Sequence, residues 1–185
     1  MDETNEMIRF PEVLLADSKI DVDSEGIVLP KILQIKEGVF FMIRSPFLVG
    51  SIKELQVESG AKFIIIGGKL ENVDYEKGDQ LIPEEAEIDG SIALVSMYVK
   101  NLPKRFMIGE SIEFAYLKEL ELPNELIVGK DLMLTDTEIS RWPELLVVNR
   151  NVYCSKEQRA KIHELMAEEK ATLHGKCIID RYGNL

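Results

Sequence analysis

The two histidines and two cysteines of this chain could bind a metal ion or act as nucleophiles, and all four follow residue 153. His174, Cys177 and Asp180 follow one another at intervals of three residues. This H-x-x-C-x-x-D spacing matches no established zinc motif. His163 and Glu164 match the start of the zinc-protease motif H-E-x-x-H, but Ala167 occupies the position of its second histidine. We therefore expect solvated or packing side chains here, with no metal site and no cofactor.

Cys154 is the other candidate for chemistry, as a nucleophile. No histidine is placed to lower the pKa of its thiol, so we expect a small buried apolar group. The chain also lacks a phosphate-binding loop, a dinucleotide-binding glycine turn and a serine nucleophile elbow. These features favour a non-catalytic protein. An enzyme whose site is assembled from residues far apart in the sequence remains an alternative.

Composition and charge exclude several classes of protein. The 185 residues, 45% of them hydrophobic, suffice for one domain with a sizeable core. A net charge of −11 argues against direct binding of nucleic acid and favours a soluble protein that tolerates a basic partner. No apolar run approaches the roughly 20 residues of a membrane helix. The acidic N-terminus does not resemble a signal peptide, so we expect a cytoplasmic location.

The negative charge is concentrated between Glu71 and Asp89, where eight acidic residues accompany one base, Lys77. The segment lacks the flanking helices and the glycine position of an EF-hand loop. We expect a solvated loop that bulges from an irregular coil. A contact with a basic protein, or a calcium site, is the alternative interpretation.

The elements that must position any site come from a repeat of twenty residues. Pro83, Pro103, Pro123 and Pro143 set its spacing. In all four units, the fifth, ninth and eleventh residues after the proline are apolar. They are Ile88, Ile108, Val128 and Val148; Ile92, Ile112, Leu132 and Val152; and Leu94, Phe114, Leu134 and Cys154. Self-similarity at a fixed period is typical of a stacked repeat protein.

The same pattern extends toward the N-terminus, where Pro11 and Pro30 are nineteen residues apart. Between residues 43 and 82 it is less regular. There, residues 48–52 resemble residues 88–92, and residues 66–70 resemble another copy. The sequence therefore predicts about eight coils, with units near residues 11, 30, 44, 61, 83, 103, 123 and 143.

Each unit carries two short alternating stretches, such as residues 126–128 and 132–134. Alternation places Leu126 and Val128 on one face and Ile127 on the other. We expect Gly109 and Gly129 to form corners because glycine tolerates positive φ. Stacked coils would pair as parallel strands about 4.8 Å apart and form a rod roughly 40 Å long.

The segment 132–143, L-x-L-x-x-T-x-I-x-x-W-P, resembles the strand and turn of a bacterial leucine-rich repeat, L-x-L-x-x-N-x-L-x-x-L-P. The family's asparagine position holds Met97, Leu117 and Thr137 here. The resemblance implies a binding scaffold rather than a particular chemistry. Both a curved horseshoe and a less curved β-solenoid fit this pattern. The predicted fold class is thus mainly β, a single-chain solenoid with a C-terminal capping helix.

The C-terminal end carries a clear helix signal. Ser155 and Gln158 form a capping-box sequence, and Ile162, Leu165 and Met166 follow at helical spacing. We expect a helix over about residues 156–170 that closes the end of the rod. The predicted organisation is an N-terminal segment, 1–10, which could fold over the first coil, a solenoid, 11–155, and a helix cap and tail, 156–185.

The outward positions of the strands indicate a function. Met107, Ile127 and Val147 would form an apolar strip on consecutive coils, and Met133 and Tyr153 occupy a second outward position. We predict that these five residues bind a protein partner or a second copy of the chain. An acidic mimic of nucleic acid, bound by a basic DNA-binding protein, is the alternative. Coverage of the strip by the C-terminal helix or tail would remove this site.

Overall fold

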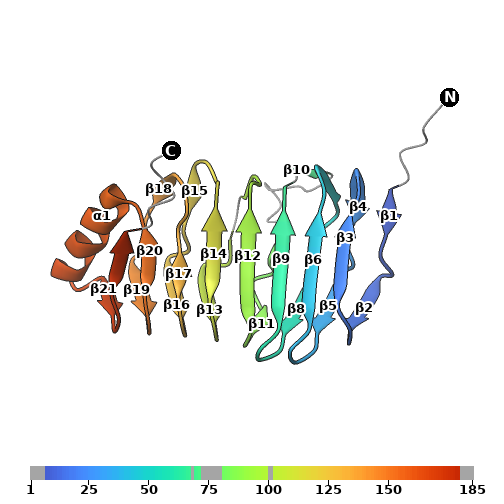
Figure 1. Ribbon diagram of the computed structural model, residues 1–185, viewed down its shortest axis with the longest axis horizontal. Helices are drawn as coiled ribbons and strands as arrows, with labels where there is room; N and C mark the ends of the chain where they lie inside the picture. Colours follow the sequence, from blue (N-terminus) through green and yellow to red (C-terminus); the bar gives the residue numbers. More distant parts are fainter. Residues whose placement is uncertain (1–6, 68, 72–80, 100–101, 180–185) are drawn as a thin grey trace.

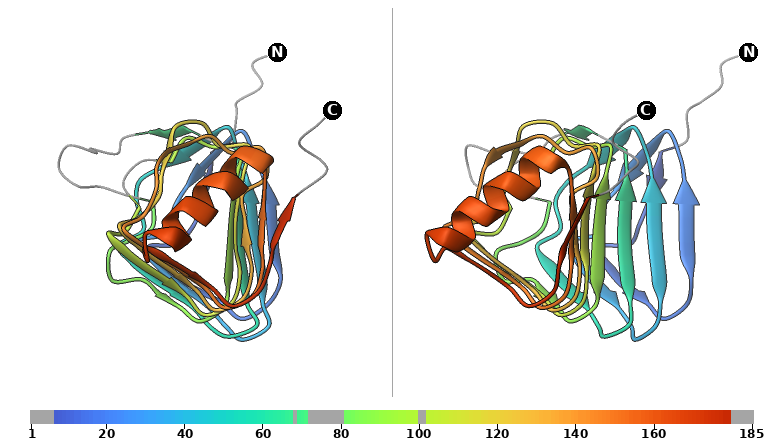
Figure 2. Two further views of the ribbon diagram at one scale, coloured as in Figure 1. Left: turned by 90° about the vertical axis from the view of Figure 1, so that its left-hand side faces the viewer. Right: turned by 60° about the vertical axis from the view of Figure 1, so that its left-hand side comes forward.

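The computed structural model describes residues 7–67, 69–71, 81–99 and 102–179 (Figure 1). The chain winds as a β-solenoid of about seven turns with a spacing of about 21 residues, and one helix follows the last full coil. Strands of successive coils pair in parallel and in register. Viewed toward the helix end, the coils enclose a three-sided interior (Figure 2). The predicted fold class, a mainly β solenoid with a C-terminal helix, is confirmed.

The strands form three walls, of which the most continuous is one sheet of eight strands, called here the long wall. Its strands, in sequence order, are β3 (Ile20–Asp23), β6 (Phe40–Arg44), β9 (Lys62–Ile66), β12 (Ser91–Val95), β14 (Ile112–Ala115), β17 (Leu132–Met133), β20 (Val152–Cys154) and β22 (Cys177–Ile179). Every coil contributes one strand and the segment after the C-terminal helix adds β22, so this wall runs the length of the solenoid (Figure 1).

The second wall consists of two four-stranded sheets. The first sheet contains β2 (Val13–Ala16), β5 (Ile32–Ile35), β8 (Glu54–Val57) and β11 (Glu87–Ile88). The other contains β13 (Arg105–Ile108), β16 (Glu125–Val128), β19 (Leu145–Val148) and β21 (Ala171–Leu173). The two sheets meet between β11 and β13, where the Gly109 N–H donates to the Ile88 carbonyl over 2.7 Å.

The third wall is the least regular. Its strands are β1 (Ile8–Arg9), β4 (Gly26–Val28), β7 (Phe47–Val49) and β10 (Lys69–Glu71), followed further along the solenoid by β15 (Leu120–Glu121) and β18 (Ile139–Arg141). Strand β1 pairs in parallel with β4. Residues 8 and 9 therefore extend this wall, and they do not fold across the first coil.

The interior is filled by the apolar columns that the repeat predicted. All twelve column residues from Ile88 to Cys154 are buried. Toward the N-terminus the columns continue through Phe41 and Phe63, whose rings meet edge to face with centroids 5.6 Å apart. Because each column side chain packs on the same position of the next coil, no coil can bury its apolar face alone.

The predicted number of coils was too high by one. Ile52 occupies the position that proline holds in the other coils. The residue after Pro30, Lys31, donates its N–H to the Glu12 carbonyl, and the residue after Ile52, Lys53, donates its N–H to the Lys31 carbonyl in the same way. A single long coil therefore replaces the two units expected near residues 44 and 61. The similarity of residues 48–52 to residues 88–92 was misleading, because the two segments lie at different corners of the coil.

The corner glycines of the C-terminal half are explained by close packing and not by positive φ. The backbone at Gly109 and Gly129 is outside the left-handed region. A Cβ on Gly129 would lie 2.0 Å from the Gly109 carbonyl oxygen. Left-handed residues occur instead at the corner after the long wall, at Gly67, Ser96 and Tyr116.

Helix α1 (Lys156–Ala167) lies across the C-terminal end of the solenoid (Figure 2). Ser155 and Gln158 form the predicted capping box, with the Gln158 N–H 3.2 Å from the Ser155 hydroxyl. Ile162 and Leu165 are buried in the core, whereas Met166, which we expected to pack with them, is 40% exposed. After the helix the chain adds β21 to the second wall and β22 to the long wall.

Candidate functional site

The predicted apolar strip exists as a geometric feature of the second wall. Met107 pairs in register with Ile127, and Ile127 with Val147, on the adjacent strands β13, β16 and β19. All three side chains point away from the interior, because Leu126 and Val128 on either side of Ile127 are buried. Met107 is 50% exposed and the other two are half-buried. Among the described residues, helix α1 packs mainly on β21 and β22, and Met107 of the strip stays exposed.

A hollow of about 440 Å³ adjoins the strip on the second wall. It is lined by Ala86, Glu87, Ile88, Asp89, Met107, Ile108, Gly109, Ile127 and Gly129. The depression lies where the two-residue strand β11 meets the four-residue strand β13. Glu87 and Asp89 are exposed at its edge, so an apolar floor is bordered by negative charge.

Met133 and Tyr153 lie on a different wall from the strip. They pair with each other on β17 and β20 of the long wall. The structure therefore divides the five predicted contact residues into a strip of three and a pair of two. Their outward column contains Asp21, Met42, Ile64, Ala93, Glu113, Met133, Tyr153 and Ile178.

The long wall has a shallow hollow of its own, of about 350 Å³. Ala93 lines the hollow between Ile64 and Glu113, its neighbours in the outward column, and Met133 lines it beyond Glu113. Lys62, Glu110 and Lys130 line the hollow as well, so charged groups of both signs surround it. The Lys130 ammonium lies 2.6 Å from Glu110 Oε1, and this hydrogen bond lowers the pKa of the Glu110 carboxyl.

A ladder of polar side chains stabilises the corner between the second wall and the long wall. Its members are Ser91, Ser111, Asp131 and Asn151, which occupy the same position in successive coils. Each side chain accepts a hydrogen bond from the backbone N–H of the next member, and Asn151 accepts from Lys176 N. The ladder supplies acceptors for N–H groups that would otherwise be unpaired at the corner. The spacing of twenty residues was its only sequence signal.

Thr137 forms hydrogen bonds that join two coils. Its buried hydroxyl donates to the carbonyl of Phe114 over 2.9 Å and accepts from the Leu117 N–H at 3.4 Å. The bond to Phe114 ties the last full coil to the one before it. The side chain of Gln158 reaches the Thr137 carbonyl from the opposite side, at 2.7 Å.

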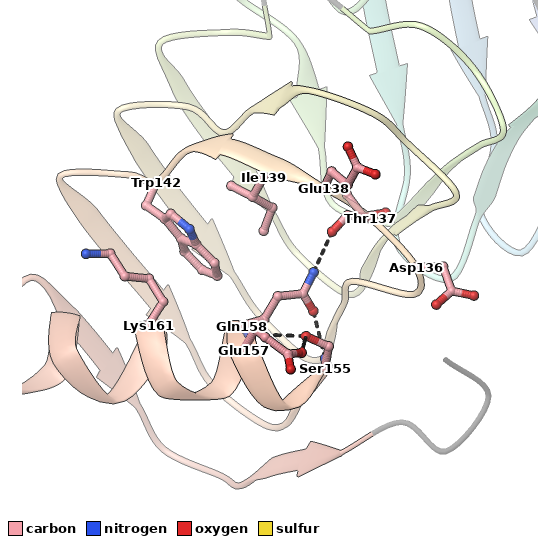
Figure 3. Close-up of a pocket in the computed structure, with 9 residues that line it drawn as sticks. All are labelled: Asp136, Thr137, Glu138, Ile139, Trp142, Ser155, Glu157, Gln158 and Lys161. Carbon is pink, nitrogen blue, oxygen red and sulfur yellow. Dashed lines mark hydrogen bonds between the residues drawn. The ribbon is translucent and has the colours of Figure 1, made fainter. Parts of the chain in front are cut away.

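A groove of about 620 Å³ lies between the last coil and the first turns of helix α1 (Figure 3). It is lined by Asp136, Thr137, Glu138, Ile139, Trp142, Ser155, Glu157, Gln158 and Lys161. Trp142 forms an apolar wall and is half-buried. The groove beside Trp142 depends on where helix α1 begins, which the twenty-residue repeat does not determine.

The cysteines have the environment of structural thiols. Cys154 is buried, and burial raises the pKa of its thiol to about 12. Burial also raises the pKa of Cys177. Neither thiol is ionised to a useful extent at neutral pH, and ionisation is what a nucleophile requires. His163 and His174 are exposed. Asp180 and residues 72–80, which hold three of the eight acids of the acidic stretch, lie outside the described residues.

Comparison with known proteins gives no relative for this chain. No family model, no curated protein and no solved structure matches it. Within the described ranges, no helix is long and apolar enough to cross a membrane.

Proposed function

We propose that this chain is a non-catalytic binding scaffold of the cytoplasm, which holds a protein partner on the strip formed by Met107, Ile127 and Val147. The observation that supports this proposal is the register of the three side chains on adjacent strands. Neighbouring strands are about 4.8 Å apart. The strip is therefore a continuous apolar surface about 10 Å long, fixed by a sheet that is paired on both sides.

The surroundings of the strip favour a protein as the ligand. Leu145, 36% exposed, adds apolar surface in the neighbouring outward position of β19. The adjoining hollow can accept a side chain from a partner, and Glu87 and Asp89 at its edge favour a partner with basic groups around an apolar centre. An apolar centre with a charged rim is the usual anatomy of a protein interface.

The resemblance to leucine-rich repeats is consistent with this proposal. Those proteins use the regular spacing of their strands to present side chains from several repeats to one partner. The chain described here has strands on three walls, so the second wall would serve as the binding surface. The partner is either another protein or a second copy of this chain.

The test compares two lysine substitutions in the same outward column of the second wall. Ile127→Lys lies in the strip, and Gln34→Lys lies on β5, away from the strip and in the column that joins Gln34 to Gln56. Light scattering detects self-association, and a photo-crosslinking residue at position 107 captures another partner in the native host. We expect Ile127→Lys to abolish the complex and Gln34→Lys to preserve it, while both variants remain folded.

Three outcomes would contradict the proposal. A complex that survives Ile127→Lys would show that the strip is not the contact. Unfolding of Ile127→Lys would show that the side chain belongs to the core. Binding that weakens strongly with salt and ignores Ile127→Lys would favour the acidic mimic of nucleic acid, because salt screens charges and not apolar contacts.

A further inference from the structure

The groove at the C-terminal end is a gap in the stacking of the third wall. On the second wall, β21 covers the edge of β19, and on the long wall β22 covers β20. On the third wall, β18 pairs with β15 on one side, and no strand in the part of the chain that the structure describes pairs with its other edge. Helix α1 crosses the end of the solenoid beside that edge (Figure 3).

The free edge of β18 has backbone groups directed toward the groove. The Glu138 N–H bonds to Leu117 O and the Glu138 carbonyl accepts from Leu120 N, so both groups of Glu138 point to the preceding coil. Successive residues of a strand direct their backbone groups to opposite edges. Leu120 pairs with Ile139 in the ladder, so the N–H and carbonyl of Ile139 point toward the groove. The register shifts before Arg141, whose carbonyl accepts from Leu122 N and points back to the preceding coil. An extended peptide can pair with such an edge by adding one more strand.

The side chains of the groove select the charge of the peptide. Asp136, Glu138 and Glu157 contribute three carboxylates. Among the lining residues that the structure describes, Lys161 is the single basic one, and its ammonium lies 2.7 Å from the Glu164 carboxylate, outside the groove. The N-terminus of helix α1 favours an anion, but Ser155 already caps it and Glu157 occupies its first turn. The carboxylates therefore dominate, and the groove favours a cation.

Trp142 gives the cation an aromatic surface. It continues the column of Leu102 and Leu122, is half-buried against the core and lines the groove. In Figure 3, Trp142 lies on one side of Gln158 and Asp136 on the other. The aliphatic part of an arginine or lysine side chain fits against the indole, with its charged end reaching the carboxylates.

We propose that this groove binds an extended segment of another protein that adds to β18 as a strand and places an arginine or lysine side chain over Trp142. This site is separate from the strip on the second wall and does not depend on it. The Ile127→Lys variant should therefore bind the segment as the unchanged protein does.

The single tryptophan of the chain reports directly on the groove. The probe is the capped peptide acetyl-Val-Thr-Arg-Thr-Val-amide, which contains no aromatic residue, and the matched control peptide has citrulline in place of arginine. We expect the arginine peptide to change the tryptophan fluorescence saturably and to bind about tenfold more tightly than the citrulline peptide. Equal binding of the two peptides, or no saturable change with either, would overturn the proposal.

Two variants and one competing ligand sharpen the test. Glu138→Gln removes a charge from the groove and should weaken the arginine peptide about threefold or more. Glu144→Gln makes the same change outside the groove and should have no effect. Equal affinities in the two variants would contradict the proposed charge contact. Inorganic phosphate is the opposite probe: a saturable fluorescence response to phosphate, without one to the arginine peptide, would identify an anion site and overturn the proposal.

Discussion

The side-chain amide of Gln158 donates a hydrogen bond of 2.7 Å to the backbone carbonyl of Thr137 and so joins helix α1 to the last full coil. The Gln158 side-chain oxygen also accepts from the Ser155 N–H at 2.8 Å. Gln158 is 8% exposed, so both bonds are shielded from water. One side chain thus caps the helix and satisfies a carbonyl at the open end of the stack.

Replacement of Gln158 should destabilise the whole solenoid. Gln158→Ala leaves the Thr137 carbonyl and the Ser155 N–H without their partner, which should lower the free energy of unfolding by about 1–3 kcal/mol. Urea denaturation followed by circular dichroism measures this change. Arg159→Ala is the control, because Arg159 is the next, exposed residue, and it should change the free energy by less than about 0.5 kcal/mol. Equal midpoints for the two variants would exclude a stabilising role for Gln158.

Two adjacent residues of β16 test the assignment of inward and outward positions. Leu126→Ala removes a fully buried side chain and should cost about 2–5 kcal/mol. Ile127→Ala removes a side chain of the same size from the strip and should cost less than about 1.5 kcal/mol. Chemical denaturation of both variants measures the difference. A larger loss for Ile127→Ala would mean that the register of β16 is shifted by one residue.

The close packing of the corners makes a prediction for glycine. Gly129→Ala places a Cβ 2.0 Å from a backbone oxygen that cannot move without its coil, so we expect a loss of about 3 kcal/mol or more. Gly38 has a φ of +70° but open space around it, and Gly38→Ala should cost about 1–2 kcal/mol through backbone strain alone. Thermal unfolding ranks the two variants. The reverse order would show that strain outweighs contact at these corners.

The buried thiol predicts how stability depends on pH. The pKa of Cys154 is raised from 9.0 to about 12 in the folded protein. Between these values the unfolded chain releases the thiol proton and the folded protein retains it, so stability present below pH 9 should fall as the pH rises toward 12. Urea denaturation across this range should show a smaller decline for Cys154→Ala than for the unchanged chain. Parallel declines would indicate that other groups control the alkaline loss.

The sequence predicted the solenoid, its apolar columns and its terminal helix because each depends on residue type at a fixed spacing. It did not predict which wall a residue occupies. Alternation shows only that Met133 and Ile127 face outward, whereas the corner between their strands decides that they lie on separate walls. The missing proline at Ile52 hid one corner and led to one coil too many. The groove beside Trp142 depends on the path of the chain after the last coil, which the repeat does not encode.

The polar ladder from Ser91 to Asn151 also affects how the number of coils can change during evolution. Each member serves as acceptor for the same backbone position one coil later, and serine, aspartate and asparagine all perform this task. After duplication or deletion of a block of twenty residues, each backbone N–H of the ladder would therefore still meet a side-chain acceptor on the preceding coil. Such a gene could lengthen or shorten its product in whole units, while insertions of other sizes would have to bulge outward as loops.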